Sequence, residues 1–535
     1  DVAINGVPGV EYLEPLVMST AEGYPYCLER KNGETGKRRY FEGVPGDRKI
    51  APGSLLEERY NTLVENPTLV PQIVGIECAK DELVDISKVT VKPKTRLFTI
   101  LPLEYNLRVR VKYLSFIKMI MKNRSKWACQ VGINPYSLEW THLVQRLSAK
   151  GTNILNCDYK NFDGFVPGIL LDLIATAINR VYKDTMDDIE CLTESAIERA
   201  NLLRAANNRY SICDGKVYLV QSGIPSGFPL TVVVNSILNE LLIRYCYRKL
   251  VPDPFLSCRF NNFVDLIVYG DDNVIFINDV VKEHFNGERL KSLLASYGIT
   301  ITDGADKNSP TLTFKKLEEV DFLKRKFKVI TPNDIVAPLA KESIYGCLHY
   351  HKRTNGDLDA IKVNIEVALR EMYLHGTDDF VTFRNWANST GLFRPLELPT
   401  YEQVHLFYEQ KGNRLPMSSL NLEFFFNPDV RDACLVQRPL MEVQCLISGI
   451  YTTSWTYLKK NKHLLNEDKL FLLCGVDFMS SQNNVVTVKY PTGIGLGNLP
   501  TLTFLKTMFQ KNPELRKQVN RAHELGKDIV FVSTV

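Results

Sequence analysis

The chain has 535 residues, of which 45% are hydrophobic and 24% charged, an ordinary globular composition that excludes disorder, collagen and coiled coil as the main architecture. Lysine and arginine exceed aspartate and glutamate by only four, an average that by itself suggests indifference to nucleic acid. At roughly 150 residues per domain, the length predicts three or four domains or one large multi-lobed enzyme.

Cysteine spacing and apolar runs narrow the class further. The 12 cysteines are scattered without any CxxC pair, which argues against a zinc ribbon or a redox motif and favours reduced thiols in a cytosolic protein. The Cys347–His351 cluster has a spacing that suits no common structural zinc site. No apolar run is long enough to indicate a membrane span, and no signal peptide is visible. The chain starts at Asp1 rather than at a methionine, so we expect a processed product or a fragment.

Positive charge is concentrated in residues 86–126, where eleven lysines and arginines stand against one acid, Glu104. This basic window carries a net charge of +10, which leaves −6 for the rest of the chain. A solvated face is the usual interpretation of such a run. Here bases are interleaved with apolar residues at 97–101 in a strand-like alternation, so we predict an ordered wall that faces phosphates.

The middle of the chain predicts a mixed α/β fold. Short β-branched and aromatic runs around Asp-Gly or Gly-Asp turns are typical of hairpins, and apolar residues at helical spacing indicate helices between them. Gly298 follows the last of these helices as a stop signal. The predicted elements are a strand at 153–157, a hairpin of strands 211–213 and 216–220, a helix at 231–250, a hairpin of strands 263–269 and 273–277, and a helix at 288–297.

Three aspartates stand where predicted strands end. Asp158 directly follows the first strand, and Asp271 and Asp272 form the tip of the second hairpin. If these elements are neighbours in one sheet, the carboxylates meet at one edge and form an oxygen-rich site for Mg²⁺. A pair of such ions can activate a 3′-hydroxyl and stabilise a leaving pyrophosphate. The alternative is ordinary surface aspartates at loop tips.

A loop of small residues at 221–227 leads towards the predicted helix at 231–250. Small residues let a backbone approach a ligand closely. Thr231 and Asn235 are four positions apart, so both side chains project from one face of that helix. We expect them to hydrogen-bond a sugar, or a carboxylate that contacts one.

These segments, in this order, resemble the sequence motifs of the viral RNA-dependent RNA polymerases of the picorna-like group. The amino-acid sequence of residues 223–245 is most similar to that of the polymerases of plant viruses of the comovirus and nepovirus kind (secovirids). The matching segments are Ser19–Tyr26 (motif G), Lys80–Leu83 with Lys94–Leu97 (motif F), Asp158–Asp163 (motif A), Ser226–Asn235 (motif B), Tyr269–Asp272 (motif C), Ala305–Lys307 (motif D) and Phe322–Arg325 (motif E).

The resemblance implies an α/β (α+β) right-hand polymerase fold, with fingers, palm and thumb around an antiparallel palm sheet. The basic window becomes part of the fingers. The implied lobes are fingers at 1–111 with a truncated N-terminal part, palm at 112–179, a fingers insertion at 180–222, palm at 223–335, thumb at 336–420, and thumb or C-terminal extension at 421–535.

The resemblance also implies a role for each matching residue. Asp158, Asp271 and Asp272 hold the catalytic Mg²⁺, or Mn²⁺ in its place, and Lys307 protonates the leaving pyrophosphate. The implied nucleotide-binding residues are Lys80, Lys94, Arg96, Asp163, Ser226, Gly227, Thr231 and Asn235. The implied RNA-binding residues are Gly23, Tyr24 and Pro25 at the template entry, and Phe322, Leu323, Lys324 and Arg325 at the primer.

The implied function is an RNA-directed RNA polymerase, a nucleotidyltransferase that replicates a positive-strand RNA virus genome. Its implied partners are an RNA template and primer, ribonucleoside triphosphates, a protein primer of the VPg kind and other viral replication proteins. Its implied location is the host cytoplasm, at membrane-associated replication complexes, without a transmembrane segment of its own.

The sequence departs from the family pattern at two places. Val84 stands where the family often has a second basic residue, and only 18 residues precede Ser19, where the family carries a longer fingers segment. Two other functions remain as alternatives. The polar Asp163 argues against a reverse transcriptase, and the intact aspartates argue against a non-catalytic RNA-binding protein with the palm fold.

Overall fold

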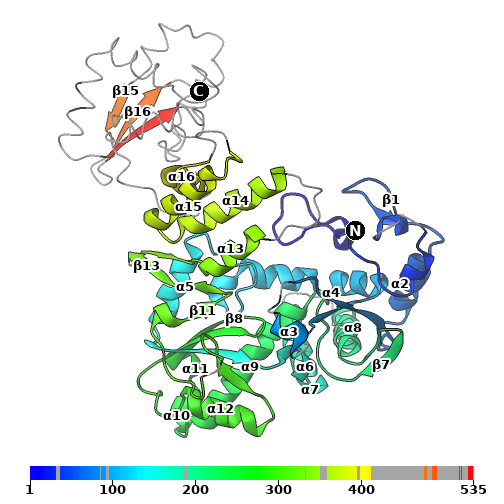
Figure 1. The fold of residues 1–535 in the computed structure, drawn as a ribbon. Helices are drawn as coiled ribbons and strands as arrows, with labels where there is room; N and C mark the ends of the chain where they lie inside the picture. Colours follow the sequence, from blue (N-terminus) through cyan, green and yellow to red (C-terminus); the bar gives the residue numbers. More distant parts are fainter. Residues whose placement is uncertain are drawn as a thin grey trace. The chain divides into compact units, whose positions relative to one another are not determined.

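The computed structural model describes residues 1–31, 36–82, 84, 86–91, 95–184, 189–307, 309–331, 333–349, 358–393, 398–410, 475–478, 485–490, 517, 520 and 528–533. The chain divides into two compact units (Figure 1). The first unit comprises residues 1–133 and 145–323, and the second comprises residues 134–144 and 324–535.

A four-stranded antiparallel sheet lies at the centre of the first unit. Its strand order is β10-β5-β9-β8, and β8 and β9 form the hairpin that the sequence predicts. Both strands of the hairpin are nearly buried throughout, which explains their continuous apolar sequence. The strands are β5 (Asn153–Tyr159), β8 (Val264–Tyr269), β9 (Asp272–Ile277) and β10 (Ile301–Asp303).

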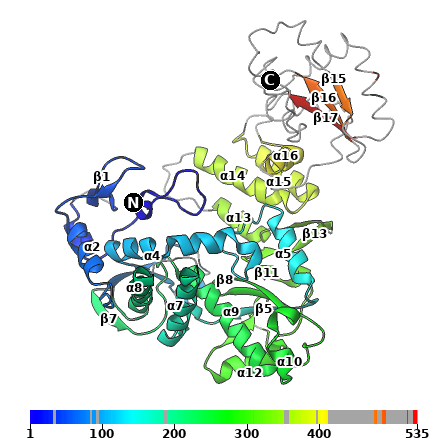
Figure 2. The same cartoon turned by 180° about the vertical axis from the view of Figure 1, so that it is seen from behind.

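Helix α9 (Thr231–Leu250) packs against β8 and organises the helices around this sheet (Figures 1 and 2). α12 (Gly287–Ser296) packs against both α9 and β10. Asn286 caps α12 by accepting a hydrogen bond from the Arg289 N–H, and Gly298 follows its end at φ 78°. The short helices α10 (Pro254–Ser257) and α11 (Phe260–Phe263) also contact α9.

A second sheet of the first unit has the strand order β4-β3-β6-β7, with β7 at its edge (Figure 2). Asp214 and Gly215 form the turn between β6 and β7 with φ of 50° and 71°, as the Asp-Gly pair predicts. Buried tyrosines of α4 fix the helices beside it, because Tyr105 donates to the Leu202 carbonyl and Tyr113 to the Arg199 carbonyl. The elements are β3 (Val74–Ala79), β4 (Leu97–Ile100), β6 (Arg209–Cys213), β7 (Lys216–Val220), α4 (Leu103–Lys122), α7 (Gly168–Lys183) and α8 (Ile189–Asn207).

Shorter elements complete the first unit. A small core of Tyr26, Tyr40, Leu56, Leu103 and Leu107 joins the first 65 residues to α4. The elements are α1 (Val2–Asn5), η1 (Tyr26–Glu29), η2 (Arg38–Tyr40), β1 (Phe41–Glu42), β2 (Lys49–Ile50), α2 (Leu55–Glu65), α3 (Ser87–Thr90), η3 (Arg124–Lys126), α6 (Phe162–Phe165), η4 (Leu317–Glu319) and β11 (Asp321–Phe322).

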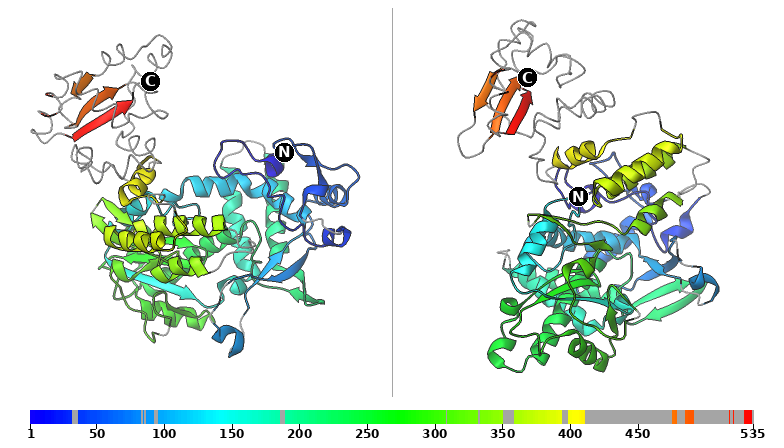
Figure 3. Two further views of the ribbon diagram at one scale, coloured as in Figure 1. Left: turned by 45° about the horizontal axis from the view of Figure 1, so that its top comes forward. Right: turned by 60° about the vertical axis from the view of Figure 1, so that its left-hand side comes forward.

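The second unit is mainly helical among its described residues. α14 packs against α13, α15 and α16, and these helices lie together in every view (Figures 1 to 3). The start of α5 (Glu139–Ser148) belongs to this unit, where Trp140 stacks on Phe327 at 4.8 Å. The other elements are β12 (Arg325–Lys326), β13 (Lys328–Thr331), β14 (Asp334–Val336), α13 (Lys341–His349), α14 (Leu358–Tyr373), α15 (Thr377–Ser389), α16 (Tyr401–Gln410), β15 (Gly475–Phe478), β16 (Val485–Tyr490) and β17 (Asp528–Ser533).

The structure confirms the predicted strands and helices of the middle region within one or two residues. The strand-like alternation predicted at 97–101 is confirmed by β4, and the basic window continues into the long helix α4 at residues 103–122. None of the helices in the described part of the chain is both long and apolar enough to cross a bilayer.

Candidate active site

The edge of the central sheet brings Asp158, Asp271 and Asp272 together. In the register of β5 against β9, Cys157 lies opposite Asn273, so the next residues along, Asp158 and Asp272, reach the same edge. Tyr269 pairs with Asp272, and Gly270 closes the turn at φ 66° with Asp271 at its tip. The adjacency of the two elements, on which the sequence prediction depended, is therefore present.

The three carboxylates repel one another. Although Asp271 reaches the surface, the surrounding protein withdraws water from it, and together with the Asp163 and Asp158 carboxylates this raises its pKa. Desolvation raises the pKa of the half-buried Asp272 to about 7, and Asp271 and Asp158 add to this effect. A hydrogen bond of 2.6 Å from the Leu323 N–H to Asp272 Oδ2 acts in the opposite direction. A cation at this edge would relieve the repulsion.

Lys307 supplies one such cation. Its Nζ lies 2.8 Å from Asp158 Oδ2, and its side chain is 67% exposed. Exposed ion pairs of this kind contribute little to stability, so the contact can be exchanged for another anion at low cost. Lys307 and the carboxylates are thus within reach of one reacting group.

The residues present fit a divalent cation that takes part of its coordination from a substrate. Within the described ranges, no three His, Cys, Asp or Glu side chains form a ready-made metal site. Mg²⁺ is usually held by one or two carboxylates together with water and substrate phosphates, and Mn²⁺ accepts the same oxygen ligands. The desolvated, mutually repelling carboxylates match this requirement. The separate Cys347–His351 cluster extends beyond the described residues at His351.

Polar side chains that sequence reasoning missed hold the aspartate turn. On α9, Ser236 Oγ accepts the Gly270 N–H at 2.8 Å, and Asn239 Nδ2 donates to the Gly270 and Asp271 carbonyls at 3.1 and 3.0 Å. On β9, Asn273 Nδ2 donates to the Cys157 carbonyl, which ties β9 to the end of β5. All three side chains are buried. The available signal was a polar residue inside an otherwise apolar helix or strand.

A second network surrounds Asp163, next to the carboxylate edge. Asn235 Nδ2 donates to Asp163 Oδ1 at 2.6 Å, and Ser226 Oγ donates to Asp163 Oδ2 at 3.2 Å. Asn235 is 2% exposed, and its Oδ1 accepts no hydrogen bond from the residues that the structure describes. Thr231 Oγ1 instead donates to the Pro225 and Phe228 carbonyls, so it shapes the loop. The structure therefore brings Asp163, Ser226 and Asn235 together and directs Thr231 to the backbone.

Two glycines let the loop at 221–227 approach its neighbours. Gly223 has φ 79°, and a Cβ there would lie 2.6 Å from the Asp163 carbonyl oxygen. Gly227 has φ 122°, and a Cβ there would collide with the Thr99 carbonyl oxygen on β4. The Thr99 N–H donates to the Ser226 carbonyl at 2.8 Å, so the loop is also attached to the second sheet. A side chain at either glycine would displace Ser226 from Asp163.

The predicted triphosphate-binding residues lie on a separate segment. The Arg96 side chain is 64% exposed and pairs with Glu82 at 3.2 Å. The Lys80 N–H donates to the Arg96 carbonyl, which brings the two residues together next to β4. Lys94 lies outside the described residues. At the predicted template entry, Gly23 has φ 83° and sits against the Leu101 carbonyl, with Tyr24 and Pro25 half-buried.

Only part of the predicted primer-binding turn is exposed to solvent. Phe322 is fully buried, and Leu323 and Lys324 have φ of 55° and 60°. Lys324 is exposed, whereas Arg325 forms a bidentate pair with Glu371 at 2.8 and 2.9 Å within the second unit. Any support that Phe322 and Arg325 give to RNA is therefore indirect, through the backbone that they hold.

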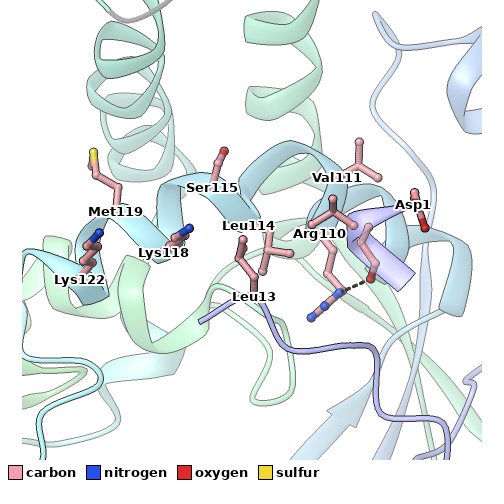
Figure 4. A pocket seen from close by; sticks show the side chains of 11 residues that line it. Asp1, Leu13, Arg110, Val111, Leu114, Ser115, Lys118, Met119 and Lys122 are labelled. Carbon is pink, nitrogen blue, oxygen red and sulfur yellow. Dashed lines mark hydrogen bonds between the residues drawn. The ribbon is translucent and has the colours of Figure 1, made fainter. Parts of the chain in front are cut away.

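The basic window is not a continuous phosphate-facing wall, which corrects the sequence prediction. Arg108 and Lys112 both pair with the buried Glu198 of α8. Arg110 Nε donates to the Ala3 carbonyl at 2.7 Å (Figure 4). Arg108 and Lys112 lie on one side of α4 and Arg110 lies on the opposite side, and both sides contact protein that is distant in sequence.

A cavity of about 630 Å³ lies along α4 and shares no residue with the carboxylate edge (Figure 4). Leu13, Leu114 and Met119 contribute apolar surface to it. Lys118 and Lys122 also line it, and neither side chain has a hydrogen-bond or ion-pair partner in the part of the chain that the structure describes.

Comparison with known proteins places this geometry in a family. Residues 2–383 match the family model described as viral RNA-dependent RNA polymerase. The chain is 38% identical over 549 residues to the RNA1 polyprotein of Cowpea mosaic virus (strain SB), covering 99% of this chain and 28% of the polyprotein. It is 45% identical over 412 residues to the RNA1 polyprotein of Arabis mosaic virus (isolate NW), covering 76% and 17%. These relatives confirm the predicted similarity to comoviruses and nepoviruses.

A solved structure shows the same fold. The Sicinivirus 3Dpol RNA-dependent RNA polymerase matches with a TM-score of 0.61 and 20% identity, over 77% of this chain and 80% of that chain. The predicted polymerase fold is thereby confirmed. The chain spans less than a third of the first polyproteins that it matches.

Proposed function

Because the chain belongs to the family of viral RNA-dependent RNA polymerases, we propose that it joins ribonucleoside triphosphates to the 3′-hydroxyl of an RNA strand and releases pyrophosphate. The observation that carries this proposal is the meeting of Asp158, Asp271 and Asp272 at one sheet edge, with Lys307 beside them. A nucleotidyl transfer needs charge stabilisation at the phosphates and a proton for the leaving group, and this edge offers both.

Asp158 and Asp271 would hold Mg²⁺, with Asp272 beside them. Bound divalent ions at such a site supply an activated 3′-hydroxyl and charge stabilisation of the pyrophosphate. The chain's own residues bring the reactants into line: the turn held by Ser236 and Asn239 fixes Asp271 relative to Asp158. Lys307 exchanges Asp158 for the pyrophosphate oxygen and donates its Nζ proton there as the P–O bond breaks.

The network around Asp163 supports a preference for ribonucleotides. Asp163 and the Asn235 Oδ1, which has no donor among the described residues, lie where polar groups can recognise a ribose 2′-hydroxyl, and an apolar side chain there would exclude it. Arg96 is exposed and carries a second positive charge for the triphosphate. The protein primer, the other viral replication proteins and the membrane-associated location stay predictions.

Primer extension on a primed RNA tests the proposal. We expect ribonucleotide incorporation to depend on Mg²⁺ and to fall at least about 1,000-fold in Asp271→Ala. Asp279→Ala is the matched control, because Asp279 follows the same hairpin but is exposed, and its side chain contacts Lys282 and Asn153, which starts β5 at the end away from Asp158. Equal rates for wild type and Asp271→Ala would favour a non-catalytic RNA-binding protein, and a preference for deoxynucleotides would favour a reverse transcriptase.

A further inference from the structure

The loop that carries Lys307 is closed by a buried ion pair. Strand β10 ends at Asp303, and the loop returns to the sheet at Lys315. Lys315 Nζ lies 2.9 Å from Asp303 Oδ2, and the two side chains are 18% and 2% exposed. The pair therefore joins the beginning of the loop to its end, out of contact with most of the solvent.

The other oxygen of the same carboxylate fixes the backbone directly before Lys307. Asp303 Oδ1 accepts hydrogen bonds from the Ala305 N–H at 2.9 Å and from the Asp306 N–H at 3.0 Å. Both oxygens of Asp303 are thus used inside this loop, one for each end. Hydrogen bonds to a buried carboxylate are stronger than those between neutral groups, so they hold the two peptide units firmly.

The loop is also attached to β5, the strand that carries Asp158. The Gly304 N–H donates to the Asn156 carbonyl at 2.9 Å, and the Lys315 N–H donates to the Ile154 carbonyl at 2.9 Å. A Cβ at Gly304 would collide with the buried Asn156 side chain, so any other residue there would force Asn156 to move. The distance from β5 to Lys307 is consequently set by the loop.

Lys307 cannot fix its own position, because its contact with Asp158 is exposed and such pairs order a side chain weakly. We propose that Asp303 is a positioning residue for Lys307, which acts through the two amides that precede it, with Lys315 as the partner that makes its buried charge tolerable. This inference rests on the proposed function, in which Lys307 protonates pyrophosphate.

A double-mutant cycle on single-nucleotide incorporation tests the proposal. Lys307→Met removes the acid, and Asp303→Ala removes the amide acceptor. We expect Asp303→Ala to slow the maximal rate about 10-fold or more with the nucleotide KM changed less than about 3-fold, and to cause no further loss in the Lys307→Met background. An equal loss in both backgrounds would overturn the proposal.

A second pair of variants separates positioning from folding. The double variant Asp303→Asn with Lys315→Gln has no buried charge but keeps a side-chain oxygen that can accept from the two amides. The double variant Asp303→Ala with Lys315→Gln has neither the buried charge nor the acceptor. Rescue of the rate by asparagine, with similar thermal unfolding of the two variants, supports the proposal, and equally slow rates contradict it. If Lys307→Met keeps the wild-type rate, the positioning role falls while the polymerase function stands. If the wild-type chain incorporates nothing, the proposed function falls and takes this inference with it.

Discussion

Charge is concentrated both at the carboxylate edge of the central sheet and at Arg108 and Lys112 on α4. The two places differ in whether the protein supplies a buried charge of opposite sign. On α4, Arg108 and Lys112 share the buried Glu198 as their ion-pair partner. At the sheet edge, Asp271 and Asp272 have raised pKa values, because water is withdrawn and neighbouring carboxylates repel them. Charge that the protein pairs with an opposite charge of its own serves stability, whereas carboxylates that it leaves next to one another are available for a ligand.

The first test of this difference removes the anion that pairs with the α4 cations. Glu198→Gln would leave Arg108 and Lys112 without their common anion in a buried place, and we expect a loss of about 3 kcal/mol of folding free energy. Thermal unfolding measures the loss, with the exposed Lys126→Ala as the control. An unfolding temperature within about 1 °C of wild type would show that the α4 cations are not structural and would return them to the phosphate-facing wall.

The next largest effect should come from the uncharged scaffold of the carboxylate edge. Asn239→Leu keeps the volume of the side chain but removes its bonds to the Gly270 and Asp271 carbonyls and to the Tyr159 hydroxyl. We expect the rate of nucleotide incorporation to fall about 100-fold, with RNA affinity changed less than about 2-fold. Glu240→Gln on the same helix is the control, because among the described residues the Glu240 side chain pairs with its neighbour Arg244 and not with the aspartate turn. A matched loss of RNA binding would contradict this assignment.

Arg96 tests whether any of the basic window contacts substrate. Its pairing with Glu82 is exposed, so the guanidinium can be redirected to a triphosphate. We expect Arg96→Ala to raise the nucleotide KM about 10-fold and to change the RNA Kd less than about 2-fold. Lys122→Ala, at the cavity along α4, should change neither constant. If RNA binding weakens more than nucleotide binding, Arg96 contacts the template instead.

The sequence predicted the central elements well because their signals are local. The β-branched and aromatic runs in 264–269 and 272–277 and the Gly-Asp turn between them define a hairpin without help from the rest of the chain. The sequence could not predict that Asp158 lies beside that hairpin, because strand pairing across more than 100 residues has no local signal. The meeting of the carboxylates therefore depended on the assumption that the two elements are neighbours in one sheet. The fingers, palm and thumb came from motif resemblance and not from periodicity.

What the sequence could not predict are partners that are distant along the chain. Glu198 lies 90 residues after Arg108. The charge sum over residues 86–126 therefore counted the Arg108 guanidinium as available, although in the fold it is paired with Glu198. The same limit hid the role of Asn239, whose partners are 31 and 32 residues away. A polar residue inside an apolar helix indicated that a partner exists but not which one.

The smallest predicted effect tests whether the carboxylate edge really bears an uncompensated charge. The pKa of Asp272 is about 7 in the folded protein and has a usual value of 3.8, so between about pH 4 and 7 the folded chain keeps a proton that the unfolded chain releases. This contribution to stability is present below pH 4, declines as the pH rises to 7, and stays lost above it. Asp272→Asn removes the titration and keeps an acceptor for the Leu323 N–H. Unfolding in a chelator should therefore show the variant more stable than wild type at pH 8, by at least about 1 kcal/mol, and similar to it at pH 4. An equal difference in stability between the variant and wild type at both pH values would mean that ionised Asp272 does not destabilise the fold. The contrast with α4 would then depend on Asp271 alone.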